Sequence, residues 1–583
     1  MAEAPPPEST ESNLRRDGGE RGLSLSERAA ASLASRLYAT PLHRLRLRGR
    51  FPLKLLGVPA DPVPGDPHLA ERILAGRLIH AGHTVMIRDL DFRTVAAPAV
   101  WQQWAQGWGW LRHLAILPDR KTAIAAAEAL GQRWLNAYAD YDPLAWRADI
   151  TGTRLMMALG HAPVILGSGN QIFRSAVLSA LATWARHLDR AAPRLPDGLA
   201  QAQAWCGLYA AGTLIPGGEV RAARALAGLQ ALLGRLVLPD GGIASRAPGD
   251  ALALAELLLF TANAPECIGT RAPPLFADTL ARLVPTLRGL ALGDGRIGAW
   301  HGSAVIGADA LDRLARKAAT GTELRRGGRW SGFHRLSAGR TIVILDAGPP
   351  PPARLCTPGS IGGHAGTLAF EMSDGAERLI TNCGGAAGLP QALAPALAAG
   401  LATTAAHSTL VIADTNSTRI RDDGTLAGGV ETVAMAYRST GEGQLIETSH
   451  DGYVRRFGML VRRRLFLSPD GNELAGEDAI EAAPVKLLRR RGDRPFDLRF
   501  HLGPGVSATP TADGLGALLK TPAGRIWAFK CHAEGGNGCR LAIDQSLWVD
   551  ETGTIHRTQQ LVISGQTAKA AADLAWSLRR AGK

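Results

Sequence analysis

The chain of 583 residues is 46% hydrophobic and 20% charged, which is typical of a folded protein with more than one domain. It contains no run of about 20 apolar residues, so the sequence predicts no membrane-spanning helix. The formal net charge of +13 favours polyanionic partners, but there is no zinc-finger spacing, RNP-like aromatic motif or basic zipper to indicate nucleic acid. The arginine content behind this charge is explained equally well by the base composition of the genome, because alanine and glycine are also abundant.

The first 25 residues are polar and rich in proline, glutamate and arginine. They lack the apolar segment of a secretory signal, and we expect residues 1–25 to form a disordered tail. The six cysteines show no CxxC spacing, and scattered cysteines in a large chain are usually buried thiols.

Helical periodicity follows, with apolar residues along one face of each segment. Loops such as LPDG and IPGG separate the segments, which favours antiparallel helical hairpins. We therefore expect a helical domain over residues 26–325. Its predicted helices cover residues 68–82, 121–137, 143–160, 171–188, 200–213, 220–238, 250–262 and 277–291.

After about residue 330 the apolar period changes to two, and strand follows strand without intervening helices. This pattern predicts an antiparallel sandwich over residues 326–570. Its strands include residues 341–346, 409–414, 459–467, 497–502 and 525–531. Three consecutive arginines, 462–464, lie inside one strand, so the middle one faces away from the other two. They form either a solvated sheet face or a strand that meets a polyanion.

The most specific stretch is GGHAGTLAFEMSDGAERLITNCGG at residues 362–385. It predicts a β-hairpin that turns at Asp374-Gly375 and brings His364 near Asn382. His407 precedes another strand. Two imidazoles and one side-chain oxygen at strand ends suit zinc or another divalent metal. The alternative is a pair of buried histidines that hydrogen-bond the backbone.

The segments GGHAGTLAFEM, LITNCGG and AAHSTLVI, in this order, resemble the heparinase II/III-like polysaccharide lyases. Residues 236–259 and 450–478 resemble the same family. The resemblance implies a multidomain α and β fold, in which an incomplete (α/α) toroid precedes a C-terminal antiparallel β-sandwich. It also implies an enzyme, a lyase that cleaves an acidic, uronic-acid-containing polysaccharide by β-elimination in a basic cleft between the domains. Family members work in the cell envelope or periplasm, whereas the missing signal favours the cytoplasm as the alternative.

The resemblance assigns the metal ligands residue by residue. The second histidine of the family's His-x-His segment falls on His364, and its first falls on Gly362. The aspartate ligand falls on Asn382, and the remaining ligand histidine corresponds to His407. The implied site is a structural metal held by His364, Asn382 and His407.

β-Elimination needs a group that neutralises the substrate carboxylate, a base and an acid. The resemblance points to Asn170 in the helical half and to Arg246 where the family has a tyrosine-bearing segment. His301 lies between the halves, and Tyr453 lies in a family core motif, so we add both as catalytic candidates.

Each catalytic candidate also has a structural interpretation. Asn170 precedes a helical face and suits an N-cap. Arg246 has Asp240 and Asp250 as nearby pairing partners. Tyr453 suits the sandwich core. Two functions therefore remain open: a lyase acting on an acidic polysaccharide, and a catalytically degenerate relative that binds an envelope or capsular polysaccharide.

Overall fold

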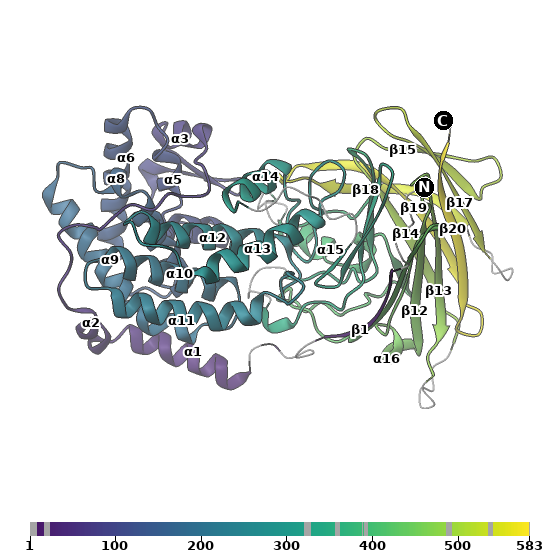
Figure 1. The fold of residues 1–583 in the computed structure, drawn as a ribbon, viewed down its shortest axis with the longest axis horizontal. Coiled ribbons are helices and arrows are strands. Elements are labelled where there is room, and N and C mark those ends of the chain that lie inside the picture. Colours follow the sequence, from purple (N-terminus) through teal and green to yellow (C-terminus); the bar gives the residue numbers. More distant parts are fainter. Residues whose placement is uncertain are drawn as a thin grey trace.

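The computed structural model describes residues 8–16, 22, 24–319, 328–355, 362–386, 389, 394–484, 492–533 and 540–581. Helices gather at one end of the elongated molecule and sheets at the other, as Figure 1 shows. The predicted order, a helical toroid followed by an antiparallel sandwich, is confirmed. None of the described helices combines the length and apolar content needed to cross a membrane.

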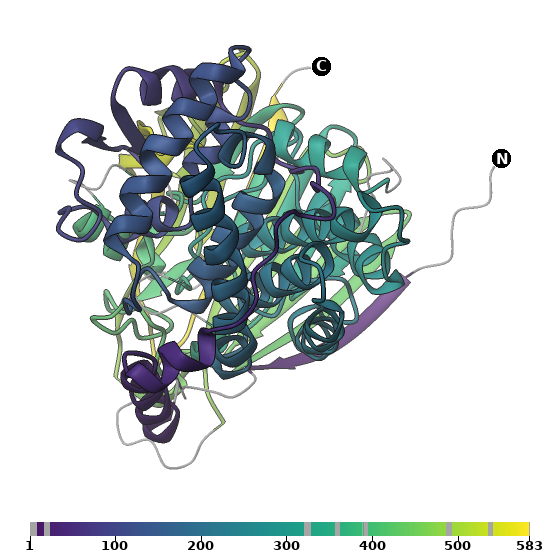
Figure 2. The ribbon, with the colours of Figure 1, turned by 90° about the vertical axis from the view of Figure 1, so that its left-hand side faces the viewer.

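The helical domain packs around α10 (Leu199–Leu214), which contacts α7, α9, α11 and α12. Nearly all of α10 is buried, because it is apolar on every face. The glycines 152 and 207 allow α7 and α10 to cross closely, since a Cβ on Gly207 would lie 2.4 Å from the Gly152 carbonyl oxygen. Figure 2 looks along the long axis of the molecule from its helical end. The other helices are α1 (Leu25–Tyr38), α2 (Pro41–Leu47), α3 (Pro67–Leu74), α4 (Ala99–Gln106), α5 (Trp110–Leu114), α6 (Arg120–Ala137), α7 (Ala148–Gly160), α8 (Ala162–Ile165), α9 (Gln171–Ala191), α11 (Glu219–Leu236), α12 (Pro248–Glu266), α13 (Pro274–Gly289) and α14 (Ala308–Lys317).

One predicted helix is partly wrong. Residues 68–82 were expected to be helical throughout, but α3 ends at Leu74. The chain then forms a small antiparallel hairpin of β2 (Arg77–His80) and β3 (His83–Met86). Gly76 and Gly82, with φ of 80° and 70°, supply the left-handed conformations that end the helix and turn the hairpin.

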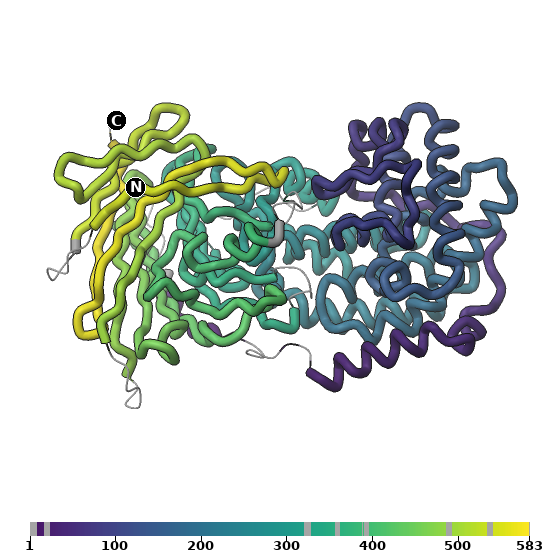
Figure 3. The backbone as a smooth tube through the Cα atoms, turned by 180° about the vertical axis from the view of Figure 1, so that it is seen from behind, coloured from purple at the N-terminus to yellow at the C-terminus, as the bar shows by residue number. Residues whose placement is uncertain are grey.

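The sandwich consists of two antiparallel sheets whose inner faces share one apolar core. One sheet has the order β1-β10-β11-β12-β13-β20-β17-β16-β15, and the other β18-β19-β14-β8-β7-β6-β5-β4, with β9 paired to β14. Figure 3 shows the long β18–β19 hairpin, in yellow, extending from the sandwich toward the helices. The strands after the helical domain are β4 (Gly328–Trp330), β5 (Phe333–Ala338), β6 (Thr341–Asp346), β7 (Phe370–Asp374), β8 (Glu377–Thr381), β9 (Leu410–Ile412), β10 (Thr432–Thr440), β11 (Gly443–His450), β12 (Met459–Leu467), β13 (Glu473–Ala482), β14 (Pro495–Leu502), β15 (Ser507–Pro510), β16 (Gly516–Lys520), β17 (Ile526–Ala533), β18 (Arg540–Val549), β19 (Ile555–Gln566) and β20 (Ala572–Ala581). Short helices α15 (Ala394–Leu401) and α16 (Val454–Phe457) lie between strands.

The prediction of a disordered tail over residues 1–25 is wrong for part of that range. Residues Glu8–Arg15 form β1, which pairs antiparallel with β10 at the edge of the first sheet. An edge strand is held by backbone hydrogen bonds, so its polar sequence, ESTESNLR, gave no periodic signal. The next residue, Arg16, is buried. Part of the predicted N-terminal tail therefore belongs to the sandwich domain.

The predicted end of the sandwich at residue 570 is also wrong. Strand β20 (Ala572–Ala581) lies beyond it and pairs with both β13 and β17 in the middle of the first sheet. Trp576 of this strand is buried, and its ring is 4.8 Å from that of Phe500 across the sandwich. The last strand is thus part of the core.

The three arginines of β12 alternate as predicted. Arg463 is completely buried, donates to Asp478 at 2.7 Å and holds the carbonyl oxygens of Leu368 and Ser408. Arg462 and Arg464 are partly exposed on the opposite face and pair with glutamates of neighbouring strands. The outer pair therefore belongs to a solvated, charge-balanced sheet face.

Candidate functional site at the junction of the two domains

A cluster of buried charge lies where the helices meet the sandwich, and Arg246 is at its centre. Its guanidinium donates to Asp346 Oδ1 at 2.5 Å and to the carbonyl oxygens of Pro349 at 2.7 Å and Gly348 at 3.1 Å. His301 Nε2 lies 3.1 Å from Arg246 Nη1 and 3.2 Å from Asp346 Oδ2. Arg246 and His301 come from helical-domain loops, whereas Asp346 ends β6, so the cluster joins the two domains.

Burial decides the charges in this cluster. It lowers the pKa of His301, and the neighbouring Arg246 lowers it further, so the imidazole is neutral. Burial raises the pKa of Asp346, but the Arg246 charge and the hydrogen bond from His301 outweigh it and hold the pKa below its usual range. Asp346 is therefore ionised and accepts from His301 Nε2–H. His301 Nδ1 is buried and has no hydrogen-bond partner among the described residues.

The predicted partners of Arg246 are wrong. The arginine pairs with Asp346 and with neither Asp240 nor Asp250. Arg246 adopts φ of 56°, a left-handed conformation that an arginine accepts here because every guanidinium nitrogen is held by a partner. Among the described residues, the hydrogen bonds of the Arg246 guanidinium all go to groups at the junction of the two domains.

The structure brings His364 and His407 together, as expected for side chains at converging strand ends. His364 Nδ1 lies 3.1 Å from His407 Nε2, and His407 Nδ1 donates to the Thr403 carbonyl oxygen at 2.7 Å. Burial lowers the pKa of His407 to about 4 and holds that of His364 well below its usual value, so both rings are neutral. With these tautomers, His364 Nδ1–H donates to His407, and His364 Nε2 is left without a partner among the described residues.

Asn382 does not join this pair. Its side-chain oxygen accepts the Ser408 backbone N–H at 3.0 Å, and its amide nitrogen donates to Glu371 Oε1 at 3.2 Å. No group of three or more His, Cys, Asp or Glu side chains within the described parts of the chain is arranged to hold a metal. A structural zinc site needs four ligands, so the residues present do not fit one, and we assign no reaction step to a metal.

We expect elemental analysis of the purified protein to find no stoichiometric zinc, because the ligand set is incomplete. His364→Ala and His407→Ala variants should then leave the metal content unchanged. A metal present at one equivalent and lost in both variants would contradict this assignment. An exposed histidine variant, His68→Ala, is the matched control, since the His68 side chain is 91% exposed.

Two catalytic candidates lie away from the junction. Asn170 is the N-cap of α9: its side-chain oxygen accepts from the N–H groups of Ile172 and Phe173. Tyr453 is buried in the sandwich core and donates to the Thr415 carbonyl oxygen at 2.9 Å, and burial raises its pKa. For both residues the structural interpretation made from the sequence describes the observed contacts.

A cavity of about 490 Å³ lies beside His301. Its lining includes Gly362, where the family histidine was expected, together with Ser303 and the carboxylates of Asp250 and Glu551. Burial raises the pKa of Asp250. The lining contains no lysine or arginine among the described residues, so the expected basic groove is wrong for this cavity.

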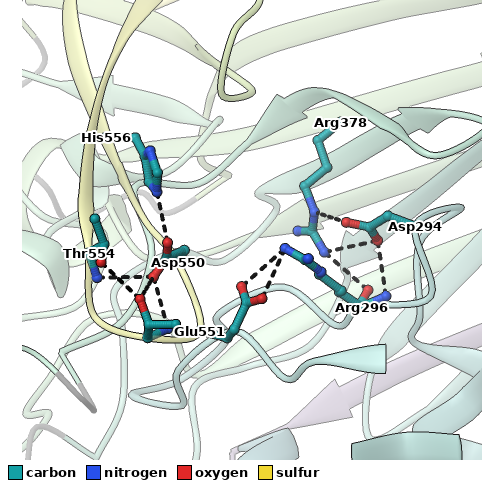
Figure 4. Close-up of polar contacts among 8 residues, drawn as sticks. Asp294, Arg296, Arg378, Asp550, Glu551, Thr554 and His556 are labelled. Atoms are coloured by element: carbon teal, nitrogen blue, oxygen red, sulfur yellow. Dashed lines mark hydrogen bonds and ion pairs between the residues drawn. The ribbon is translucent and has the colours of Figure 1, made fainter. Parts of the chain in front are cut away.

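Hydrogen bonds and ion pairs, here called the clasp, join the loop of the β18–β19 hairpin to the helical domain (Figure 4), and Glu551 of this loop also lines the cavity. Asp550 accepts from the backbone of the hairpin loop and from His556 Nε2 at 2.8 Å, which orders the loop. Glu551 is thereby presented to Arg296 of the helical domain at 3.1 Å. Behind it, Arg378 of β8 donates to Asp294 at 2.8 Å. The clasp fixes the sandwich against the loop that carries His301.

Sequence reasoning missed Asp346, Glu551 and Arg378. The sequence did carry a signal for Asp346. This residue ends the strand TIVILD directly before AGPPPP, and a carboxylate at the end of a strand is a candidate site residue. Glu551 and Arg378 carried no local signal for this role, since the partners that link them to the helical domain, Arg296 and Asp294, lie more than 80 residues away in the chain.

Comparisons with known proteins agree with this architecture. Residues 320–577 match the family described as Heparinase II/III-like, C-terminal. Over the whole length of both chains, the sequence is 28% identical to "FtsZ-localized protein C" of Caulobacter vibrioides.

Solved structures show the same fold. A crystal structure of heparinase III matches with a TM-score of 0.72 and 14% identity, covering 95% of this chain and 89% of that one. A mutant of heparan sulfate lyase HepC from Pedobacter heparinus matches with a TM-score of 0.61 and 12% identity, covering 95% and 88%. Residues 320–577 therefore match the heparinase II/III-like C-terminal family, and the chain has the toroid-and-sandwich fold of heparinase III over nearly its whole length.

Proposed function

We propose that this protein is a catalytically degenerate heparinase II/III-like protein that acts by binding, at the sites where FtsZ assembles. It keeps the family architecture as a scaffold. The cytoplasm, one of the two compartments considered from the sequence, is then its compartment.

The observation that carries the proposal concerns tyrosine. The chain has six tyrosines, and none of them lines the junction cavity. A lyase of this family uses a tyrosine as acid or base, and the segment expected to carry it holds Arg246 instead. The tyrosines lie at positions 38 and 141 beside α2, 138 and 209 in the helical core, and 437 and 453 in the sandwich.

The charge of the cavity supports the same conclusion. A uronate carboxylate needs a cation or free donors where negative charge develops. Arg246 is already paired with Asp346, and Arg296 is paired with Glu551 of the cavity wall. The lining therefore offers an acidic substrate no unpaired cation among the described residues.

The role beside FtsZ rests on the Caulobacter relative, which aligns over the full length of both chains. We expect a fluorescent fusion of this protein to concentrate at midcell and to disperse when FtsZ is depleted. Purified protein should also sediment with FtsZ polymers formed with GTP and stay in the supernatant without GTP. A uniform distribution that is insensitive to FtsZ would contradict the proposal.

A lyase remains the second candidate because of one observation. His301 is neutral, and its Nδ1 carries a lone pair without a partner beside a cavity of about 490 Å³. Such an imidazole is competent as a general base.

We expect incubation with a panel of acidic glycans to give no rise in absorbance near 232 nm, where unsaturated uronates absorb, because the acid is missing. A rise that His301→Gln abolishes would instead establish the lyase. Asn170→Ala serves as the control, since Asn170 caps a helix and does not line the cavity.

A further inference from the structure

A second, smaller pocket lies on the other face of Arg246, between β1, β4 and the proline run at residues 349–352. Its volume is about 160 Å³. Arg15, Arg16, Arg246 and Arg329 line it, together with a single carboxylate, Asp240. We call it the Arg329 pocket. No residue of the junction cavity lines it, so it is a separate site.

The walls of the Arg329 pocket are fixed by hydrogen bonds. Arg16 donates through Nη1 to the Ala427 carbonyl oxygen at 2.7 Å and through Nε to that of Pro351 at 3.2 Å. Arg246 Nη1 holds the Pro349 carbonyl oxygen at 2.7 Å. The proline run is thus tied from both sides, and proline itself restricts the backbone. A ligand would meet a preformed site.

The charge of the pocket is unbalanced. Arg246 is neutralised by Asp346, and both Asp240 oxygens accept backbone N–H groups, from Gly242 at 2.8 Å and Ser331 at 2.9 Å. Arg329 Nη1 is buried and has no hydrogen-bond partner among the described residues. A buried guanidinium donor without an acceptor is unfavourable, and native proteins rarely leave one.

The geometry points to an oxyanion site. The Arg329 pocket takes a carboxylate, sulfate or phosphate group, which accepts from the guanidinium of Arg329 and is further held by the positive charge of Arg15, an exposed residue of the lining. Guanidinium groups bind all three oxyanions through paired N–H donors. A volume of about 160 Å³ is well below the ~300 Å³ of sites for drug-sized ligands, so the ligand enters as a single charged group or one sugar unit.

Binding here would also stabilise the N-terminal strand. Leu14 and Arg15 of β1 line the pocket, so a ligand that contacts them favours the docked state of β1 on β10. The occupied pocket therefore links the N-terminal segment, the helical domain and the sandwich.

The test uses the full-length protein and isothermal titration calorimetry with inorganic phosphate, sodium sulfate and glucuronate, with glucose as the uncharged control. We expect saturable binding of at least one of the three anions and none of glucose. The anion that binds most tightly identifies the kind of ligand. Glucuronate indicates an acidic glycan, and phosphate or sulfate indicates a phosphate or sulfate ester. Arg329→Gln should weaken binding by about tenfold or more, since it removes a charged hydrogen bond.

Arg438→Gln is the matched control, because it removes the same charge from the exposed surface of β10 outside the pocket. It should change the affinity less than about twofold, as expected for an exposed charge. If Arg329→Gln does not fold, as judged by circular dichroism, the exposed Arg15→Gln variant decides, with a loss of affinity larger than that of Arg438→Gln. Absence of saturable binding of all three anions, or equal binding by the pocket variants and the control, overturns the inference. Either result is independent of FtsZ localisation.

Discussion

Lowering the pH from 6.5 toward 4 is expected to unfold this protein, because many of its histidines are buried in the neutral form. Burial lowers the pKa of four of them, His43, His80, His334 and His407, to about 4. It lowers the pKa of three others, His187, His450 and His501, to about 3. In the unfolded chain each titrates near 6.5.

The sign follows from proton binding. Between the folded and the unfolded pKa values, the unfolded chain binds more protons than the folded chain, so stability rises with pH in that window. The contribution is complete above about pH 6.5 and is lost as the pH falls toward the folded values. Each fully titrating histidine changes the free energy of unfolding by about 1.4 kcal/mol per pH unit. Before the pH reaches 4, the summed loss from several histidines exceeds ~5–15 kcal/mol, which is the free energy of unfolding of a typical protein.

Urea titrations followed by circular dichroism at pH 7.5, 6.5 and 5.5 measure the effect. His334 is the residue to change, because both of its ring nitrogens lack hydrogen-bond partners within the described part of the chain and its ring packs on Tyr437 at 4.4 Å. His334→Phe should flatten the pH dependence below pH 6.5, whereas the exposed His68→Phe should leave it unchanged. A free energy of unfolding that is constant from pH 7.5 to 5.5 would show that the buried histidines are not neutral.

Replacing Arg246 with methionine is expected to lower the free energy of unfolding by about 3–5 kcal/mol. Methionine keeps much of the side-chain volume but leaves the Asp346 carboxylate, which is 1% exposed, without its cation. It also frees the carbonyl oxygens of Ser331 and Pro349, which are held by the same guanidinium. Chemical denaturation at pH 7.5, monitored by tryptophan fluorescence, measures the loss.

The matched control is Arg464→Met on the outer face of β12. Arg464 pairs with Glu447 and Glu477, but its side chain is 41% exposed, so the loss should stay within about 1 kcal/mol. The double variant Arg246→Met, Asp346→Leu should recover part of the stability, because no unpaired buried charge remains. Equal losses in Arg246→Met and Arg464→Met would refute a special role for the junction cluster.

Three residues at strand ends, His364, Asn382 and His407, show how much of the candidate site the local sequence pattern predicted. His364 and His407 were expected to meet, and they do. The hairpin turn at Asp374-Gly375 fixes only the pairing of β7 with β8, whereas His407 precedes β9, which is placed by its pairing with β14 beside β8. Asn382 was expected to complete the set, but its amide is turned to Ser408 and Glu371. A hairpin pattern fixes backbone proximity, whereas side-chain direction depends on donors supplied by other strands.

The sequence by itself determined the two-domain order. The apolar periods of 3.6 and 2 residues are local properties of each segment and do not depend on which other segments it contacts. Tertiary structure alone decided the rest: the docking of β1 on β10, the pairing of Arg246 with Asp346, and the acidic wall of the junction cavity. These features depend on burial and on charges from segments distant in the chain. Desolvation and ion pairing are set by three-dimensional surroundings, which no local pattern encodes.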